Sequence, residues 1–196
     1  MDNKLKFIET SKLPTDIGEF TVHAFTDEKE SKDHLAICMG DLLTDEPVLS
    51  RIHSQCITGE SFFSMRCDCR FQLTESLKQI AQNGRGVIFY LQQEGRGIGL
   101  SNKIKAYSLQ DRGLDTVEAN HQLGFKDDER TYENIAGMVK YLGIKKLDLM
   151  TNNPKKIKAL KDMGIEVNQR IPLFSDTNKY NEKYISTKKS KLGHLI

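Results

Sequence analysis

The sequence predicts an α/β protein in which helices flank a mixed β-sheet and the N-terminal part is rich in strands. Two observations carry this prediction. The first 50 residues read as short strands separated by turns, whereas from residue 71 onward helical patterns alternate with short apolar strands. Because the first strands follow one another without helices between them, we expect a mixed sheet rather than a purely parallel one.

The N-terminal strands are expected at residues 19–25, 34–39 and 47–53, which are rich in β-branched and aromatic side chains. The charged run 27–33 lies between the first two of these strands. Such a run is typical of a solvated loop.

A helix and a buried strand are expected next. Leu73, Leu77 and Ile80 recur at helical spacing, and Gly84 offers a stop for that helix. Residues 87–91 are continuously apolar, which is typical of a strand that is covered on both faces.

Helices and strands continue to alternate along the rest of the chain. Apolar residues at helical spacing predict helices over residues 101–113 and 135–142, with Ser101 as the cap of the first. Short apolar runs predict strands at residues 147–150 and 165–168. The pattern therefore predicts one layered domain over residues 1–175.

Composition and charge exclude several classes of protein. The 196 residues include 29 Lys+Arg and 27 Asp+Glu, and the resulting net charge of +2 argues against a bulk nucleic-acid binder. No apolar run approaches the roughly 20 residues of a membrane helix, and residues 1–14 carry charges where a signal peptide would be apolar. We therefore expect a cytoplasmic protein that binds neither nucleic acid nor membrane. Residues 176–196 are expected to form a polar tail, whose charge run is typical of a solvated surface.

Three cysteines form the first candidate site. Cys56 is followed by Cys67 and Cys69, and thiolates bind zinc strongly. Catalytic zinc sites use three protein ligands and leave a position for water, whereas structural sites use four. A fourth ligand could come from Cys38 or His53, and buried thiols or a closed structural zinc are the simpler interpretations.

A glycine-rich segment forms the second candidate site. Residues 94–99 read EGRGIG and lie between the predicted strand at 87–91 and the next helix. Glycines let the backbone approach an anion closely, and the helix that follows offers free N–H groups. Glu94 and Arg96 suit a purine edge and phosphates. The spacing matches neither the dinucleotide fingerprint nor a Walker loop, so an ordinary glycine-rich turn is the alternative.

Two further segments stand directly before helices. Residues 151–156 read TNNPKK, where Asn153 can cap a helix that starts at Pro154. Ligands of open α/β sheets gather at the carboxyl ends of strands, so this segment and the glycine-rich one point to a shared ligand. Residues 127–130 read DDER, and acidic residues at a helix start also have a purely structural explanation.

Five motifs in this order resemble the GTP cyclohydrolase II family. They are RIHSQC at 51–56, CDC at 67–69, EGRGIGL at 94–100, DTVEAN at 115–120 and TNNPKK at 151–156. The resemblance implies hydrolysis of GTP to formate, pyrophosphate and 2,5-diamino-6-ribosylamino-4(3H)-pyrimidinone 5′-phosphate, the first step of riboflavin biosynthesis. It also implies a homodimer, one catalytic zinc per subunit, and Mg²⁺ with the triphosphate. The chain is too short to include the dihydroxybutanone-phosphate synthase often fused to this enzyme, so the monofunctional form is expected.

The resemblance assigns ligands for the metal and for GTP. Cys56, Cys67 and Cys69 match the zinc ligands, so we predict an open site in which neither Cys38 nor His53 binds the metal. The residues that match GTP contacts are Arg51, Ile52, His53, Ser54, Gln55, Gln72, Glu94, Gly95, Arg96, Thr116, Thr151 and Lys156. From its chemistry, the Glu94 carboxylate is the candidate acceptor for the N1–H and 2-amino donors of guanine.

Three residues match catalytic positions of the family. Tyr107 matches a tyrosine near the reacting centre, Asp128 the assigned proton acceptor, and Arg130 the assigned nucleophile toward the α-phosphorus. A guanidinium has a pKa above about 12, so Arg130 could instead stabilise the phosphoryl transition state. The sequence leaves both roles open.

The chain departs from the family pattern at two positions. Gln55 stands where the family often has Glu, and Arg70 stands where it often has Gly. Neither change removes a member of a motif. Two alternatives to full turnover remain: an enzyme that opens the ring but stops at the formamide, and a zinc-stabilised guanine-nucleotide-binding module.

Overall fold

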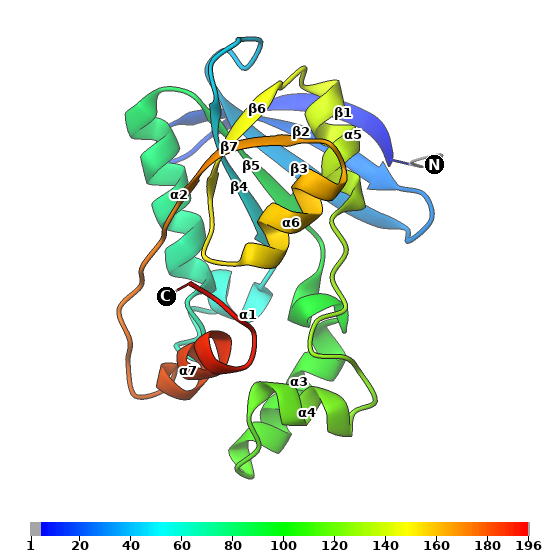
Figure 1. Cartoon of the computed structure of the whole chain (residues 1–196), viewed down its shortest axis with the longest axis vertical. Helices are drawn as coiled ribbons and strands as arrows, with labels where there is room; N and C mark the ends of the chain where they lie inside the picture. The colour runs from blue at the N-terminus through cyan, green and yellow to red at the C-terminus, as the bar shows by residue number, and fades with distance from the viewer. Residues whose placement is uncertain (1–4, 196) are drawn as a thin grey trace. The chain divides into compact units, whose positions relative to one another are not determined.

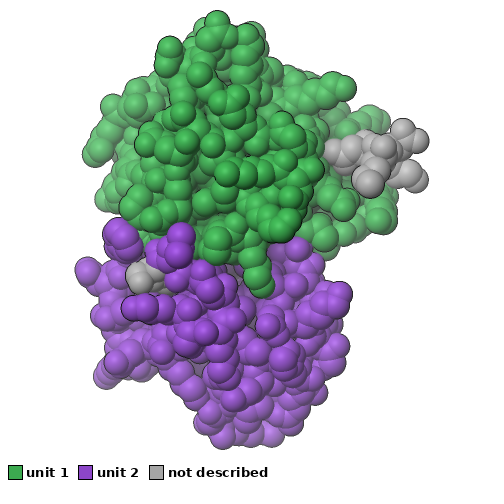
Figure 2. Space-filling model, viewed as in Figure 1, with its two compact units in different colours: residues 1–53, 74–92, 131–173 green, residues 54–73, 93–130, 174–196 purple. Residues whose placement is uncertain are grey.

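The structure is a computed structural model that describes residues 5–195. Its chain forms two compact units, which Figure 2 shows in different colours. Among the described residues, unit 1 comprises 5–53, 74–92 and 131–173, and unit 2 comprises 54–73, 93–130 and 174–195. Each unit is therefore built from three separate stretches of sequence.

A seven-stranded sheet runs in the order β1-β2-β3-β5-β4-β6-β7 (Figure 1). The strands are β1 Leu5–Pro14, β2 Glu19–Asp27, β3 Lys32–Met39, β4 Val48–Ser54, β5 Gly86–Leu91, β6 Lys146–Met150 and β7 Glu166–Ile171. The first three strands and β5 pair antiparallel, whereas β4, β6 and β7 pair parallel. The predicted mixed sheet is confirmed.

Three helices accompany the sheet. They are α2 Cys69–Asn83, α5 Glu133–Tyr141 and α6 Pro154–Asp162. In Figure 1, α5 and α6 lie against the strands, and Ile135, Met138 and Leu160 from these helices are fully buried in the core. A Cβ on Gly86 would lie 2.7 Å from the side chain of Ile80, so α2 packs closely against β5.

The second unit is mainly helical. Its elements are α1 Ile57–Glu60, a short 3₁₀ turn η1 Glu94–Gly97, α3 Leu100–Asp111, α4 Thr116–Gln122 and α7 Glu182–Ser190. The cap of α3 is Gly99 rather than the predicted Ser101. Gly99 has a φ of 83°, a conformation that glycine adopts without strain. None of the helices within residues 5–195 is long and apolar enough to cross a membrane.

Besides the four-residue elements α1 and η1, three elements were not expected from the sequence. Most residues of β1 are exposed, so this edge strand shows no clear alternation of apolar side chains. The short helix α4 rests on a capping box between Asp115 and Glu118 rather than on an apolar stripe. The third element, α7, lies within the predicted solvated tail, and its Lys188 is buried.

Candidate active site

The three cysteines of the zinc motif lie together in unit 2. Cys56 precedes α1, Cys67 lies in the loop after it, and Cys69 begins α2. Their sulfur atoms lie within 4.8 Å of one another, and the Sγ atoms of Cys56 and Cys67 are 3.6 Å apart. Two sulfurs each about 2.3 Å from a tetrahedral zinc ion would be about 3.8 Å apart. The cysteine cluster therefore fits a zinc ion.

Gly59 of α1 makes room for this cluster. A Cβ at this position would lie 2.8 Å from the Sγ of Cys67 and 3.2 Å from the Sγ of Cys56. Real Cβ atoms essentially never approach another atom to 2.8 Å. Any larger residue here would displace a sulfur atom, so the local sequence is adapted to hold the three thiols close together.

Lys103 of α3 is a functional candidate that sequence reasoning missed. Its Nζ lies 3.1 Å from the Sγ of Cys56 and 2.6 Å from the Oε1 of Glu94. Burial alone would lower the pKa of Lys103, but the nearby Cys56 thiolate, Tyr107 and Glu94 outweigh it and raise the pKa. The side chain therefore carries a positive charge beside the cysteine cluster. Its four-residue spacing from Tyr107, on one face of a helix, was the available signal.

The thiols share their protons unequally. Hydrogen bonds from Cys67 and Cys69, together with the charge of Lys103, hold the pKa of Cys56 far below its ordinary value. The same hydrogen bonding raises the pKa of Cys67 to about 11 and that of Cys69 well above its ordinary value. Cys56 is thus the sulfur that ionises first, as a metal ligand must.

Tyr107 of α3 approaches the same cluster through Thr58. The Tyr107 hydroxyl lies 3.4 Å from the Oγ1 of Thr58, which in turn lies 3.7 Å from the Sγ of Cys56. Burial raises the pKa of Tyr107 above its ordinary value. The phenol is therefore neutral near pH 7 and is able to donate a proton.

The glycine-rich segment adopts an unusual backbone. Gly95, Arg96 and Gly97 all have positive φ values, of 64°, 62° and 94°. This conformation is uncommon for a non-glycine residue such as Arg96 and marks a constrained position. Both terminal guanidinium nitrogens of Arg96 are buried and have no hydrogen-bond partner among residues 5–195. The terminal nitrogens of Arg96 thus have no hydrogen-bond acceptor among the described residues.

Asp128 and Arg130 form a tight pair next to this segment. The Arg130 Nε and Nη2 donate to the two carboxylate oxygens of Asp128 at 2.8 and 2.7 Å, and Nη1 donates to the Ser54 hydroxyl at 3.3 Å. Burial would raise the pKa of Asp128, but Arg130 holds it below its ordinary value, with a contribution from Arg96. A Cβ on Gly97 would lie 3.1 Å from the backbone of Glu129, so glycine allows this close approach.

Glu94 has a different geometry from the one expected of a base-reading carboxylate. Its Oε1 accepts from Lys103 Nζ and from the Gly95 backbone N–H at 2.8 Å, and its Oε2 accepts from the Ile57 backbone N–H at 2.7 Å. A carboxylate has about four acceptor positions, so three are occupied. In this arrangement Glu94 has too few positions left to accept both guanine donors at once.

Unit 1 brings together five of the predicted GTP-binding residues. Arg51, Ile52 and His53 lie on β4, and Thr151 and Lys156 lie after β6 and on α6. The Arg51 Nη1 donates to the carbonyl of Met150 at 2.9 Å, and the Lys156 Nζ donates to the carbonyl of Ile52 at 2.7 Å. Because β4 and β6 are parallel, these side chains share the carboxyl edge of the sheet.

The surroundings of Ile52, His53 and Cys38 are also defined in unit 1. The side chain of Ile52 is fully buried in the core, so only its main chain is available to a ligand. His53 stacks on Tyr90 with ring centroids 5.7 Å apart. Cys38 lies on β3 in the apolar core, where burial raises the pKa of its thiol to about 12.

The remaining predicted contacts lie in unit 2. Ser54 accepts from Arg130, and Gln55 is half-buried directly before Cys56. Gln72 of α2 donates from Nε2 to the Oδ2 of Asp68 at 2.6 Å. Thr116 is the first residue of α4, where Asp115 caps the helix.

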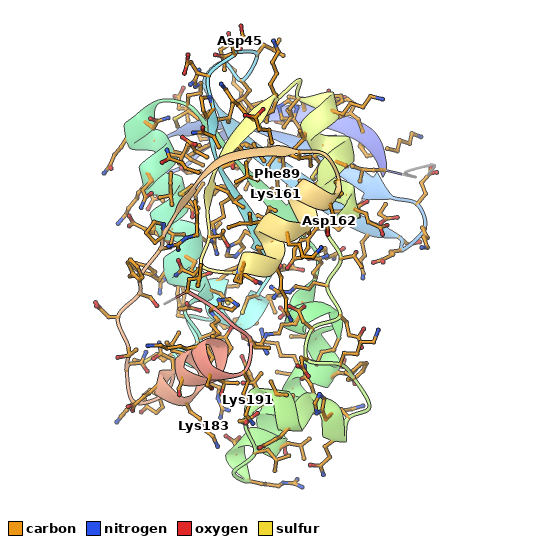
Figure 3. All side chains as sticks on the ribbon, viewed as in Figure 1. Asp45, Phe89, Lys161, Asp162, Lys183 and Lys191 are labelled. Atoms are coloured by element: carbon orange, nitrogen blue, oxygen red, sulfur yellow. The ribbon has the colours of Figure 1, made fainter. Side chains whose placement is uncertain are left out.

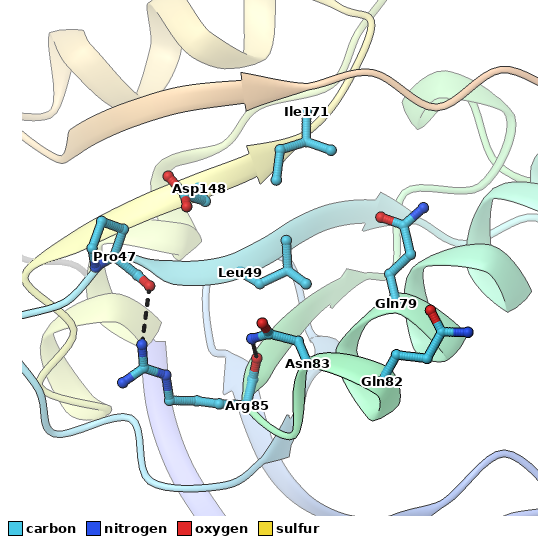
Figure 4. Close-up of a pocket in the computed structure, with 8 residues that line it drawn as sticks. All are labelled: Pro47, Leu49, Gln79, Gln82, Asn83, Arg85, Asp148 and Ile171. Atoms are coloured by element: carbon cyan, nitrogen blue, oxygen red, sulfur yellow. Dashed lines mark hydrogen bonds between the residues drawn. The ribbon is translucent and has the colours of Figure 1, made fainter.

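Unit 1 also has an open pocket of about 450 Å³ (Figure 4). Its lining residues are Pro47, Leu49, Gln79, Gln82, Asn83, Arg85, Asp148 and Ile171. None of them is a predicted site residue. The polar groups bond locally, since Arg85 donates to the carbonyl of Pro47 and Asp148 accepts from Asn168 and Gln169.

Comparison with known proteins agrees with the motifs. The profile of the GTP cyclohydrolase II family matches residues 6–172. GTP cyclohydrolase-2 from Shewanella amazonensis is 56% identical over 192 residues, which cover 98% of this chain and 94% of that protein. GTP cyclohydrolase-2 from Shewanella oneidensis is 55% identical over 192 residues, with 98% and 95% covered.

A solved structure is similar in fold. It is the two-domain 3,4-dihydroxy-2-butanone 4-phosphate synthase RibBX from A. baumannii, with a TM-score of 0.52 and 17% sequence identity. The match covers 89% of this chain but only 41% of that chain. The sequence relatives and the family profile, rather than this fold similarity, show that the chain belongs to the GTP cyclohydrolase II family.

Proposed function

We propose that this protein hydrolyses GTP to formate, pyrophosphate and 2,5-diamino-6-ribosylamino-4(3H)-pyrimidinone 5′-phosphate, the first step of riboflavin biosynthesis. The observation that carries this proposal is the cluster of Cys56, Cys67 and Cys69 in a chain of the GTP cyclohydrolase II family. When bound there, a zinc ion would supply a Lewis acid that activates water near neutral pH. Three protein ligands are typical of a catalytic rather than a structural site.

Tyr107 and Lys103 support the ring-opening chemistry. The neutral phenol of Tyr107 is two contacts away from Cys56 through Thr58, and it would donate or relay a proton near a bound metal. Lys103 offsets the negative charge of the thiolates and fixes Glu94. We therefore assign Glu94 the role of organising the cysteine and glycine-rich segments, in place of reading both guanine donors.

Arg130 acts as a charged group in our proposal. Its two hydrogen bonds to Asp128 fix the guanidinium plane and favour the protonated form, because the carboxylate has a lowered pKa and is a weak base. Such a group suits stabilisation of a phosphoryl transition state better than nucleophilic attack. Asp128 would then orient Arg130 instead of removing its proton.

The triphosphate requires cations. We propose that Arg96 and Lys156 bind it, with Arg51, His53, Ser54, Gln55, Gln72, Gly95, Thr116 and Thr151 as further contacts. Buried guanidinium nitrogens without an acceptor, as in Arg96, support an anionic ligand at this residue. We also propose that Mg²⁺ accompanies the triphosphate, because that ion is commonly bound through substrate phosphates.

The direct test is incubation of the zinc-loaded protein with GTP and Mg²⁺, with formate and pyrophosphate assayed together. We expect both products in equal amounts. Ring opening without formate would indicate an enzyme that stops at the formamide. Binding of GTP without either product would indicate a nucleotide-binding module. Omission of Mg²⁺ should abolish pyrophosphate release, and release at the full rate without it would contradict the proposed role of this ion.

We further propose a homodimer in the cytoplasm. Phe62, Phe63 and Met65 between α1 and α2, and Phe71 in the first turn of α2, are exposed. Exposed apolar side chains that are close in the chain favour contact with a second copy. The four free cysteines suit a reducing compartment. Light scattering of the parent and of Phe62→Ser tests the dimer: we expect a dimer that the substitution weakens, and a monomeric parent would contradict the proposal.

A further inference from the structure

The C-terminal helix α7 is buried on one face despite its charged sequence. The family profile matches residues 6–172, whereas α7 spans Glu182–Ser190 and lies beyond that match. Lys188 and Thr187 are buried, while Lys189 is exposed. A lysine is almost never fully buried unless it is paired, so the packing of Lys188 requires an explanation.

Lys188 is paired with the residue between two zinc-binding cysteines. Its Nζ donates to the Oδ1 of Asp68 at 2.6 Å, and these side chains are only 7% and 5% exposed. The other carboxylate oxygen of Asp68 accepts from Gln72 at 2.6 Å. Both oxygens of Asp68 are therefore held, and with them the backbone that joins Cys67 to Cys69.

Tyr184, one turn earlier on α7, contacts the glycine-rich segment. The guanidinium carbon of Arg96 lies 5.6 Å from the centre of the Tyr184 ring, and the Lys188 Nζ lies 4.5 Å from it. Both distances fall within the range of cation–π attraction. Burial raises the pKa of Tyr184, so the phenol is neutral. The ring is thus an uncharged support for the Arg96 guanidinium.

Two further lysines tie α7 to the helices that carry Tyr107 and Thr116. Lys183 donates to the carbonyls of Gly113 and Leu114, just after α3, at 2.6 and 3.3 Å. Lys191 donates to Asp115, the cap of α4, and to Glu118. Figure 3 labels both lysines at the two ends of the α7 segment.

We propose that α7 is a brace that positions the site-bearing segments of unit 2, with Lys188 and Tyr184 as its positioning residues. Lys188 fixes the cysteine loop through Asp68, and Tyr184 fixes Arg96. The inference rests on the proposed function, because it takes the cysteines as zinc ligands and Arg96 as a phosphate contact. It adds to the residues that support activity a segment that lies beyond the match to the family profile.

Zinc release tests the role of Lys188 without reference to turnover. The variants are Lys188→Met, Lys188→Arg and, as a matched control, Lys189→Met on the exposed face of the same helix. Loss of an outer partner of a metal ligand typically costs 10–100-fold in metal affinity. We expect Lys188→Met to release zinc to a chromophoric chelator at least ten-fold faster than the parent, Lys188→Arg to recover most of the difference, and Lys189→Met to match the parent. A folded Lys188→Met protein that retains zinc like the parent would overturn the proposal.

Two more variants keep the test decisive if Lys188→Met does not fold. In Asp68→Asn/Lys188→Met no buried charge is left alone, and we expect this protein to fold yet lose zinc quickly; zinc release at the parent rate would overturn the proposal. Tyr184→Leu removes the aromatic ring but no charged group, whereas Tyr184→Phe keeps the ring. We expect Tyr184→Leu to raise the KM for GTP about ten-fold with kcat and zinc release near parent values, and Tyr184→Phe to behave as the parent. An unchanged KM in Tyr184→Leu contradicts the role of Tyr184.

The parent protein separates this inference from the proposed function. If the parent binds no zinc and releases no formate, the proposed function fails whatever α7 does. If the parent is active and the α7 variants are indistinguishable from it, only the brace is wrong.

Discussion

Lys103→Met is expected to destabilise unit 2 because it leaves a buried carboxylate without its cation. The Nζ of Lys103 lies 2.6 Å from Glu94, and both side chains are 9% exposed. Removing one partner of a buried ion pair typically costs about 3–5 kcal/mol. Glu94 keeps two backbone N–H donors, from Ile57 and Gly95, so we expect the lower end, about 3 kcal/mol.

Urea unfolding followed by circular dichroism measures this effect, with zinc present and again after chelation. Lys105→Met is the matched control, because Lys105 is an exposed lysine on the same helix and such substitutions usually stay within about 0.5 kcal/mol. Glu94→Gln in the Lys103→Met background should recover part of the loss, because the Glu94 side chain then carries no buried charge. A coupling energy below about 0.5 kcal/mol between the two changes, or a Lys103→Met protein as stable as the control, would refute this account of Lys103.

Four further predictions follow from the same contacts. Cys67→Ser, once shown by circular dichroism to be folded, should lose formate release but keep some pyrophosphate release; loss of both products would mean that the metal is needed for both. Gly59→Ala should bind zinc at least ten-fold more weakly, as measured by chelator competition, because its methyl group would displace a sulfur. Asp128 has a lowered pKa, so its stabilising effect is present above its ordinary value of 3.8 and is lost as pH falls through the folded value. The difference in unfolding free energy between parent and Asp128→Asn should therefore be constant from pH 6 to about 8 and shrink below about pH 4; a difference that is flat down to pH 3 would contradict the pairing with Arg130. Arg96→Gln should raise the KM for GTP about ten-fold, as expected for loss of one charge-assisted hydrogen bond, without lowering stability in the absence of substrate; an unchanged KM would place the triphosphate elsewhere.

Local signals in the sequence account for much of the fold. The start of α6 is an example: Asn153 and Pro154 predict a capped helix, and the Asn153 side chain accepts from the Lys155 backbone N–H at 2.9 Å. The strands at 19–25, 34–39 and 87–91 are confirmed with small changes in their ends, because their apolar residues bury in one sheet. The edge strand β1 was not predicted, because an exposed edge strand needs no alternation of apolar side chains.

The part of the site whose residues are close in sequence could be predicted. Contacts between residues that are distant in sequence could not. The spacing of Cys56, Cys67 and Cys69 indicates a shared metal, and the structure gathers their sulfurs. Lys103 and Lys188 read as surface lysines, because lysine is the residue type most often left in water. Their acidic partners lie 9 and 120 positions away, and the longer of these separations carries no local signal.

The charged side chains of unit 2 differ in whether they have a hydrogen-bonded partner of opposite charge. Glu94 is paired with Lys103, Asp68 with Lys188, and Asp128 with Arg130. Each of these buried acids therefore has a cation within hydrogen-bond distance. Arg96 differs, since its terminal nitrogens are buried without a hydrogen-bond acceptor among residues 5–195. Its described interactions are with the face of the Tyr184 ring and with the charge of Asp128. Burying guanidinium nitrogens without hydrogen-bond acceptors costs free energy. A phosphate group would supply such acceptors, and the proposed function therefore assigns Arg96 to the binding of GTP.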